Sequence, residues 1–213
     1  MGKERRSLSL KTKMVLPGIL LIALFAAFTG LYYLPLMREH LIEEKKTKLK
    51  EIVESTVSLL VKLDNDQKSG LITLEDAQKS AIDLVKNIRF GPENKDYLWI
   101  NDFRPYMIVH PYVSKLDGTD LSTYKDQAGA LMFVQMASVC EREGKGYVTY
   151  MWQWKDDVNR IVPKISYVMA FAPWGWIIGT GMYIADVEQE IRSLYLRIGA
   201  ALGVITVIFL IFI

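Results

Sequence analysis

The chain has 213 residues, of which 51% are hydrophobic and 23% charged, with a formal net charge of +2. One cysteine, Cys140, excludes a disulfide scaffold. With His40 and His110 as the only histidines, a Cys/His zinc site is disfavoured, and we expect neither a metal nor a cofactor. The hydrophobic fraction exceeds the soluble average, which is typical of a chain with membrane segments.

An uncharged apolar segment covers residues 14–37. A helix rises about 1.5 Å per residue, so this segment reaches about 36 Å, enough for a hydrocarbon core of about 30 Å. A cleaved signal peptide is the competing interpretation, but its apolar region usually has about 7–15 residues. No A-x-A-like cleavage site follows here either. We therefore predict a first transmembrane helix over residues 14–37.

The last residues of the chain, 198–213, are also uncharged and read IGAALGVITVIFLIFI. This run is shorter than the about 20 residues that a membrane span needs, and it lacks the polar face of a buried globular helix. We expect residues 197–213 to be the start of a second transmembrane helix. We also expect the natural protein to continue beyond residue 213.

The distribution of charge predicts the orientation of the chain. Residues 1–13 hold five Lys and Arg and one acid, and the positive-inside rule places such an end in the cytoplasm. A nucleic-acid-binding arm is the other interpretation, disfavoured by the adjacent membrane segment. Residues 38–196 then lie outside the membrane with 20 Lys and Arg against 23 Asp and Glu. This slightly acidic domain offers no electrostatic basis for binding nucleic acid.

Two helices are expected at the start of the outer domain. Apolar residues recur at helical spacing from residue 38 to residue 63 without Gly or Pro, so this helix can continue directly out of the first span. Thr73 is the expected N-cap of a second helix, with Asp76 as the acid of a capping box. Gly91, followed by proline, is expected to end that helix.

From residue 95 onward the apolar pattern changes to the period of two that is typical of strands. The expected strands cover residues 97–101, 106–110, 146–154, 162–171 and 176–184. A helix over residues 126–140 interrupts them, and another over 185–196 leads into the second span. We therefore predict an α+β fold, in which one antiparallel sheet packs against the long N-terminal helix and two transmembrane helices flank the domain.

Several motifs of the strand region are those of a known family. They are YLWIND (97–102), HP (110–111), DQAG (126–129), GKGYVTY (144–150), PKISYV (163–168) and PWGWIIGTGMYIADV (173–187). Over about residues 38–196 the chain resembles the single Cache domain, in its small type 2, of bacterial methyl-accepting chemotaxis proteins and sensor kinases. One segment departs from the family: QWKDDVNR, residues 153–160, is more charged than the expected glycine-containing turn at the pocket rim.

The resemblance implies a PAS-like sheet in an extracytoplasmic sensor. Such a sensor lies on the periplasmic or extracellular side of the bacterial inner membrane, often binds a small carboxylate, and signals as a homodimer. In this chain, the helix over residues 41–61 carries apolar positions on a wide arc, and we expect it to form the dimer contact.

Polar side chains on the first predicted strand are candidates for ligand contact. Tyr97, Trp99 and Asn101 share one strand face, and an amide beside two aromatic rings suits the wall of a small polar pocket. A cap on the following turn is the alternative role for Asn101, and plain core is the alternative for Trp99. Two glycines of the last strand, Gly179 and Gly181, share a face where we expect close packing of a helix.

Lys164 begins an otherwise apolar strand. Lysine is rarely buried unpaired, so it either snorkels to solvent or faces an anion, and a carboxylate would accept a charge-assisted hydrogen bond from it. His110 is a pocket residue or a buried structural histidine. Tyr147 and Tyr150 point to opposite faces of their strand, so only one can line the pocket, and we select Tyr150. The predicted ligand-binding residues are Lys164, Tyr150, His110, Trp99 and Asn101.

The chain carries no GxSxG, HExxH or phosphate-binding loop, and we do not expect an enzyme. Our first hypothesis is the input module of a transmembrane chemoreceptor, in which a ligand shifts the sheet and final helix between two arrangements. A sensor histidine kinase or cyclase with the same input is the alternative. A membrane-tethered interaction domain without a small ligand is the third. The expected partners are a small carboxylate, the membrane, a second copy of the chain, and cytoplasmic signalling proteins reached through the region beyond residue 213.

Overall fold

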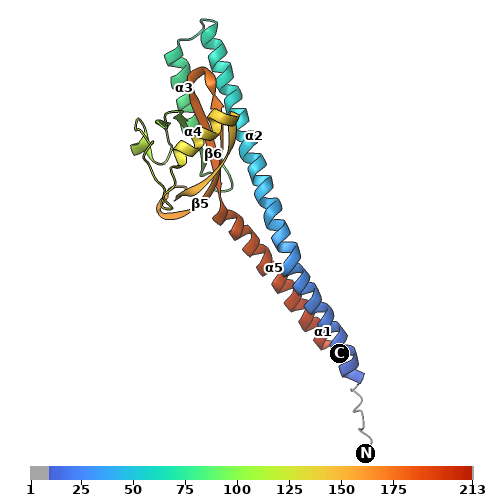
Figure 1. Cartoon of the computed structure of the whole chain (residues 1–213). Coiled ribbons are helices and arrows are strands. Elements are labelled where there is room, and N and C mark those ends of the chain that lie inside the picture. The colour runs from blue at the N-terminus through green and yellow to red at the C-terminus, as the bar shows by residue number, and fades with distance from the viewer. Residues whose placement is uncertain (1–9, 213) are drawn as a thin grey trace, which may run out of the picture. The chain divides into compact units, whose positions relative to one another are not determined.

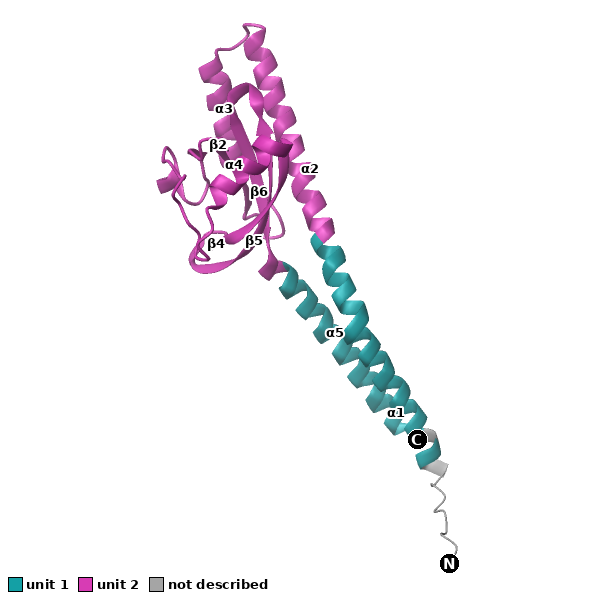
Figure 2. Cartoon of the chain, in the orientation of Figure 1, with its two compact units in different colours: residues 1–42, 187–213 teal, residues 43–186 magenta. Residues whose placement is uncertain are grey.

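The computed structural model describes residues 10–212 (Figure 1). Most of the predicted cytoplasmic segment, residues 1–13, lies outside the described residues. The chain divides into two compact units, residues 1–42 with 187–213 and residues 43–186 (Figure 2).

The first unit contains the apolar ends of the chain. Helix α1 (Leu10–Phe28) continues through a short π-helix (Thr29–Tyr33) into α2 (Leu34–Lys68), and the last helix is α5 (Ile184–Ile211). By length and composition, both ends contain helices that could cross a membrane. Within this unit Arg38 forms a salt bridge with Glu188 at 2.7 Å. The predicted helix over residues 38–63 is confirmed as an unbroken part of α2.

The second unit is built on one antiparallel sheet with the strand order β1-β2-β6-β5-β4, and β3 pairs with β2. The strands are β1 (Arg89–Phe90), β2 (Asp96–Asp102), β3 (Met107–Val109), β4 (Lys145–Trp154), β5 (Asp157–Phe171) and β6 (Trp176–Tyr183). Two further helices belong to this unit, α3 (Leu74–Asn87) and α4 (Met132–Glu143). The predicted α+β class with a long N-terminal helix is confirmed.

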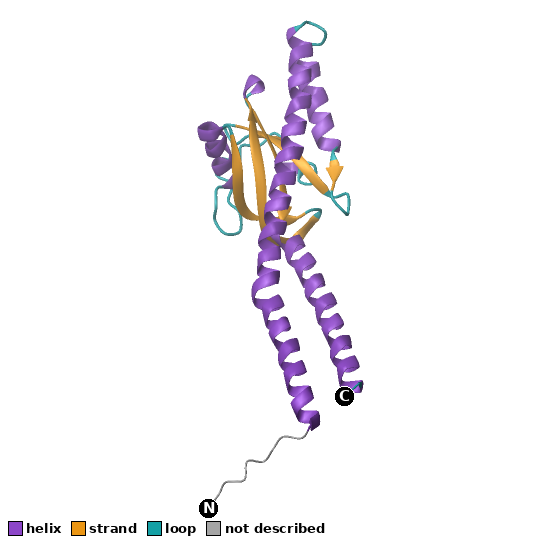
Figure 3. Cartoon of the chain, turned by 90° about the vertical axis from the view of Figure 1, so that its right-hand side faces the viewer, coloured by secondary structure: helices purple, strands orange, loops and turns teal. Residues whose placement is uncertain are grey.

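The two faces of the sheet have different coverings. The part of α2 in this unit crosses one face (Figure 3). There Tyr147 donates a hydrogen bond to the Lys46 carbonyl at 2.9 Å, and Lys145 pairs with Glu54 at 2.9 Å. Because side chains alternate along a strand, Tyr150 lies on the opposite face. That face packs in one buried cluster with α4 and the loops around it. The predicted opposite orientation of Tyr147 and Tyr150 is confirmed.

Local hydrogen bonds explain where elements begin and end. The amide of Asp76 donates to the Thr73 hydroxyl at 3.0 Å, so the predicted N-cap is confirmed. Helix α3 ends at Asn87, earlier than Gly91, because β1 follows at once and pairs with β2. The predicted helix over residues 126–140 was wrong at its start. Asp126 holds a loop there, with Oδ1 accepting from the amides of residues 128 and 130, and α4 begins at Met132.

Candidate ligand-binding site

Lys164 is buried in the sheet face that packs against α4, with only 1% of its surface exposed. Its Nζ donates to the hydroxyl of Tyr97 at 2.9 Å and to that of Tyr183 at 3.4 Å. The ring centroids of Tyr97, Tyr183 and Trp99 lie 4.1, 4.8 and 5.3 Å from the same nitrogen. Within residues 10–212, Lys164 forms no salt bridge. The ammonium is therefore surrounded by aromatic faces and neutral hydroxyls and does not snorkel to solvent.

This environment changes the charge of Lys164. Burial lowers the pKa of its ammonium to about 7, and the opposing influence of Asp96 is smaller. Desolvation disfavours the charged form of a lysine, whereas a nearby anion favours it. A carboxylate beside Nζ would therefore supply the charge partner that the surrounding residues do not.

Neighbouring strands create the space for Lys164. In the sheet register Lys164 pairs with Tyr150 on β4 and with Tyr183 on β6. A Cβ at Gly181 would overlap the Ser166 hydroxyl and lie 2.7 Å from Cε of Lys164, and a Cβ at Gly179 would overlap the ring of Trp99. The expectation that a helix packs against these glycines was wrong. The space they leave is taken by cross-strand side chains of the site itself.

Tyr97 connects Lys164 to the rest of the cluster. Its hydroxyl oxygen accepts from Lys164 and from Nε1 of Trp152, both at 2.9 Å. Its ring makes edge contacts with His110 and Tyr112 at 4.9 and 5.1 Å. Sequence reasoning placed Tyr97 on the correct strand face but did not select it. The alternation that pointed to Trp99 applied equally to Tyr97.

His110 is present in this cluster as a neutral ring. It is 2% exposed, and its Nδ1 accepts hydrogen bonds from the amides of Tyr112 and Val113 at 3.2 and 3.0 Å. Burial, with a smaller contribution from the Lys164 charge, lowers the pKa of His110 to about 3. With Nδ1 acting as an acceptor, the proton of the neutral ring is assigned to Nε2, which leaves an N–H donor.

The predicted ligand-binding residues Tyr150 and Asn101 occupy different surroundings. Tyr150 lies in the buried cluster, and its hydroxyl is 2.9 Å from the Ser166 hydroxyl. Asn101 is buried too, but its Oδ1 accepts from Nε1 of Trp99 at 3.0 Å and its Nδ2 donates to the Asp102 carbonyl. The structure thus gathers Lys164, Tyr150, His110 and Trp99 around the cluster. The side-chain amide of Asn101 instead forms hydrogen bonds with Trp99 and with the Asp102 carbonyl at the end of β2.

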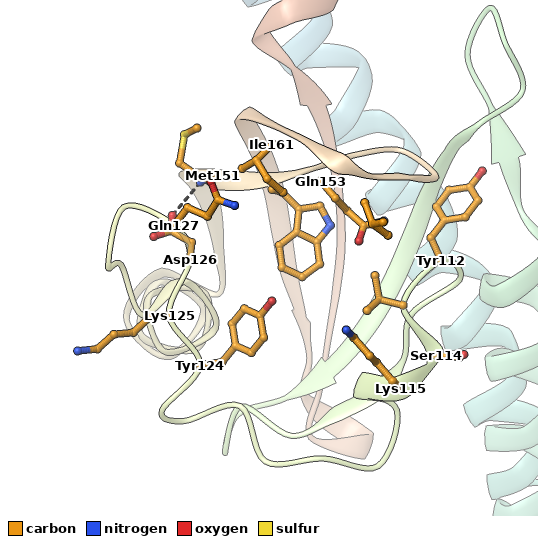
Figure 4. A pocket seen from close by; sticks show the side chains of 13 residues that line it. Tyr112, Ser114, Lys115, Tyr124, Lys125, Asp126, Gln127, Met151, Gln153 and Ile161 are labelled. Atoms are coloured by element: carbon orange, nitrogen blue, oxygen red, sulfur yellow. Dashed lines mark hydrogen bonds between the residues drawn. The ribbon is translucent and has the colours of Figure 1, made fainter.

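An open pocket of about 460 Å³ lies next to this cluster (Figure 4). It is lined by Tyr112, Val113, Ser114, Lys115, Tyr124, Lys125, Asp126, Gln127, Met151, Trp152, Gln153, Val158 and Ile161. In Figure 4 Tyr124 and Lys115 point into the pocket and Lys125 points away from it. Trp152 belongs both to the pocket wall and, through its bond to Tyr97, to the Lys164 cluster. Trp152 thus links the open pocket to the residues around the buried ammonium.

Asp126 holds the loop at the edge of this pocket. Besides its two bonds within the loop, its Oδ2 accepts from the amide of Met151 at 2.8 Å, which ties the loop to the edge strand β4. Sequence reasoning noted Asp126 only as part of a motif. Gln153 and Val158 belong to the charged segment that departs from the family pattern, so this segment does form part of the rim.

A sheet that carries a buried polar and aromatic cluster beside an open pocket, with apolar helices at both ends of the chain, is typical of a membrane-anchored small-molecule sensor. The chain belongs to the single Cache domain 2 family, whose model matches residues 41–195.

Two curated relatives are of different signalling classes. The chain is 34% identical over 199 residues to the methyl-accepting chemotaxis protein McpP of Pseudomonas putida, covering 93% of this chain and 36% of McpP. It is 27% identical over 145 residues to the sensor histidine kinase MctS of Rhizobium johnstonii, covering 68% of this chain and 31% of MctS. The chain thus spans about a third of the length of these relatives.

Two solved structures share the fold. A periplasmic sensor domain of a chemotaxis protein is 33% identical with a TM-score of 0.64, covering 67% of this chain and 96% of that domain. A Cache chemosensory domain solved to explain carboxylic acid recognition is 39% identical with a TM-score of 0.64, covering 68% of this chain and 97% of that domain.

Proposed function

We propose that this chain is the sensory input segment of a transmembrane chemoreceptor in the bacterial inner membrane. Residues 14–37 and 197–213 belong to its two membrane spans, residues 1–13 are cytoplasmic, and residues 38–196 form the extracytoplasmic sensor. The sensor binds a small carboxylate, and the signal passes through α5 to cytoplasmic partners. The chain itself acts as a sensor and not as an enzyme.

The observation that carries this proposal is the burial of Lys164 without a salt-bridge partner among residues 10–212. A buried ammonium is costly to the fold unless it is paired, so it is retained most readily where a ligand completes the pair. The carboxylic acid recognition of a 39% identical Cache domain supports the same ligand class. We propose that Lys164 holds the carboxylate, with Tyr150, His110 and Trp99 around it and Asn101 orienting Trp99.

The free energy that a small ligand can gain per heavy atom limits the affinity of this site. The best tiny ligands gain at most about 1.5 kcal/mol per heavy atom. An acid with four or five heavy atoms therefore reaches about −6 to −7.5 kcal/mol, which is a dissociation constant of about 3–40 μM at best. We expect values of tens to hundreds of micromolar, which suit the sensing of nutrients.

Calorimetry on residues 38–196 tests the proposal. Acetate, propionate, pyruvate and lactate are the ligands, with urea and a neutral amino acid as controls. Lys164→Met removes a charge-assisted bond worth about 1.5–3 kcal/mol and should weaken binding by about 10- to 150-fold. Lys145→Met removes a lysine from the other sheet face and should leave binding unchanged. Undiminished binding in Lys164→Met would remove this residue from the site, and binding of only a neutral or cationic compound would overturn the carboxylate assignment.

A sensor histidine kinase with the same input is the second candidate, favoured by the similarity to MctS. The gene sequence beyond residue 213 separates the two. A glutamate- and glutamine-rich coiled coil would assign a chemoreceptor, and a histidine box with an ATPase domain would assign a kinase.

A further inference from the structure

The turn between β4 and β5 contacts the first turn of α5. Nε1 of Trp154 donates to Oδ1 of Asp186 at 2.8 Å, and Nζ of Lys155 lies 3.6 Å from Oδ2 of the same carboxylate. Asp186 is the acid in the first turn of α5. Both of its carboxylate oxygens are therefore engaged by one hairpin, through an indole N–H and an ammonium.

The hairpin is held in an unusual conformation. Lys155 has a φ of +52°, a left-handed backbone conformation that residues other than glycine rarely adopt. Its backbone amide donates to the hydroxyl of Tyr183 at 2.9 Å. Its side chain is 96% buried, with Nζ 4.5 Å from the Trp154 ring centroid and 3.5 Å from a Glu93 oxygen. These contacts fix the turn in the position where it meets Asp186.

Tyr183 links this hairpin to the proposed binding site. Its hydroxyl oxygen accepts from the Lys155 amide at 2.9 Å and from Nζ of Lys164 at 3.4 Å. A tyrosine oxygen can accept both bonds, so one atom is shared by the hairpin and the buried ammonium. A carboxylate at Lys164 would compete with Tyr183 for the same ammonium protons. Occupation of the site would therefore change the hydrogen bonding of the residue that holds the hairpin.

We propose that Trp154 and Lys155 form a latch on the first turn of α5, and that Tyr183 is the positioning residue that couples this latch to Lys164. Helix α5 runs from this turn to Ile211 without interruption, so a change in its first turn acts directly on the helix that leads to the second apolar segment. The coupling to ligand rests on the proposed function. The latch itself does not, because its contacts are all between residues of this chain.

Hydrogen exchange with mass spectrometry on the full chain in lipid nanodiscs tests the latch first without ligand. Trp154→Phe keeps an aromatic ring and removes the N–H that reaches Asp186. Trp174→Phe is the matched control, because it removes an indole bond to a different carboxylate, Asp64, at 3.0 Å. The latch predicts about 10- to 100-fold faster exchange of the amides of residues 187–191 in Trp154→Phe only.

A second variant tests the coupling residue. Tyr183→Phe should speed exchange of the Lys155 amide by about 2- to 10-fold, because that amide loses its acceptor. Tyr147→Phe, which removes a tyrosine bond on the other sheet face, should not affect it. Equal exchange of residues 187–191 in Trp154→Phe and Trp174→Phe would overturn the latch. If Trp154→Phe speeds hydrogen exchange equally in α4 and α5, the latch is also overturned, because the contact would then serve only general stability.

The ligand arm uses sodium acetate and sodium propionate with the same chain. In the unmodified protein we expect a saturating acid to change exchange at residues 187–191. In Trp154→Phe we expect the dissociation constant, measured by calorimetry, to stay within about twofold of that of the unmodified protein. The ligand-dependent change in hydrogen exchange at residues 187–191 should be lost. Binding with an undiminished change at α5 would overturn the coupling. If calorimetry shows no carboxylate bound to the unmodified protein, the proposed function fails, while the ligand-free exchange still decides the latch.

Discussion

Carboxylate binding should depend on pH in a way that identifies Lys164. The pKa of its ammonium is lowered to about 7 by burial, so about half of the free protein carries a neutral amine at pH 7. Only the ammonium can pair with a carboxylate, and the anion restores its charge. Binding above pH 7 should therefore take up a proton from solution.

His110 and the three tyrosines around Lys164 should not titrate between pH 6 and 8.5. His110 has a pKa lowered to about 3 and stays neutral there. Burial raises the pKa values of Tyr97, Tyr150 and Tyr183, so these hydroxyls keep their protons. Asp96 opposes the loss of charge by Lys164, and this effect is already contained in the pKa of about 7.

The size of the effect follows from the protonated fraction. With a pKa of about 7, roughly 90% of Lys164 is charged at pH 6 and roughly 3% at pH 8.5, so the dissociation constant should rise about 30-fold. At pH 8 each bound carboxylate should take up about 0.9 proton, against about 0.1 at pH 6.

Titration calorimetry in two buffers of different ionisation enthalpy measures this proton uptake directly. A flat dissociation constant with no proton uptake at pH 8 would refute the reasoning, because the ligand would then not depend on a lysine with a lowered pKa. Any residual binding by Lys164→Met should be independent of pH over this range. A pH dependence that survives in Lys164→Met would assign the titration to another group.

The remaining predictions concern stability, packing, charge and assembly. Lys164→Met should raise the free energy of unfolding by about 2–4 kcal/mol below pH 7, because the native state of the unmodified protein holds there a buried ammonium that the unfolded chain solvates. This gain should fade as the pH rises toward 10.5, where the native lysine is neutral. Urea denaturation at pH 6 and 10 measures it, and a gain that grows with pH would contradict the prediction. Gly181→Ala should cost about 1–3 kcal/mol and weaken acetate binding, since its Cβ would displace Ser166 and Lys164, as thermal unfolding and calorimetry can check. Malonate should bind at least about 10-fold more weakly than propionate, because the buried cluster offers one ammonium and a second carboxylate would stay unpaired. Single cysteines along residues 41–61, in a Cys140→Ala background, should form homologous disulfide pairs in membranes; an absence of pairs at every position would count against the dimer helix.

The alternation of side chains let the sequence predict the strand face that carries the site. The period of two placed Trp99 and Asn101 on one face and separated Tyr150 from Tyr147, as the structure has them. A charged residue in an apolar strand made Lys164 stand out because its burial is unfavourable. These inferences need only local geometry, which the sequence contains.

The cross-strand contacts could not be predicted from the sequence in the same way. Tyr97 and Tyr183 surround Lys164 because of a register between strands that are far apart in sequence. The glycine at position 181 signalled a close approach but not which side chain would approach. The start of α4 was misplaced because the side chain of Asp126 stabilises a loop where the apolar spacing alone favours a helix.

The two faces of the sheet contribute differently to stability. On the α2 face Leu49, Val53 and Leu60 are fully packed apolar residues that stabilise the domain without polar cost. On the α4 face the chain retains a buried lysine whose pKa is lowered from 10.5 to about 7 by burial, so its ammonium destabilises the fold at low pH. An apolar residue of similar volume would remove that penalty, so stability alone does not account for Lys164. The carboxylate that we propose as its partner would account for it, because the penalty would then be recovered when the anion binds. Under this proposal, the difference between the free and bound states would supply free energy for shifting a conformational equilibrium.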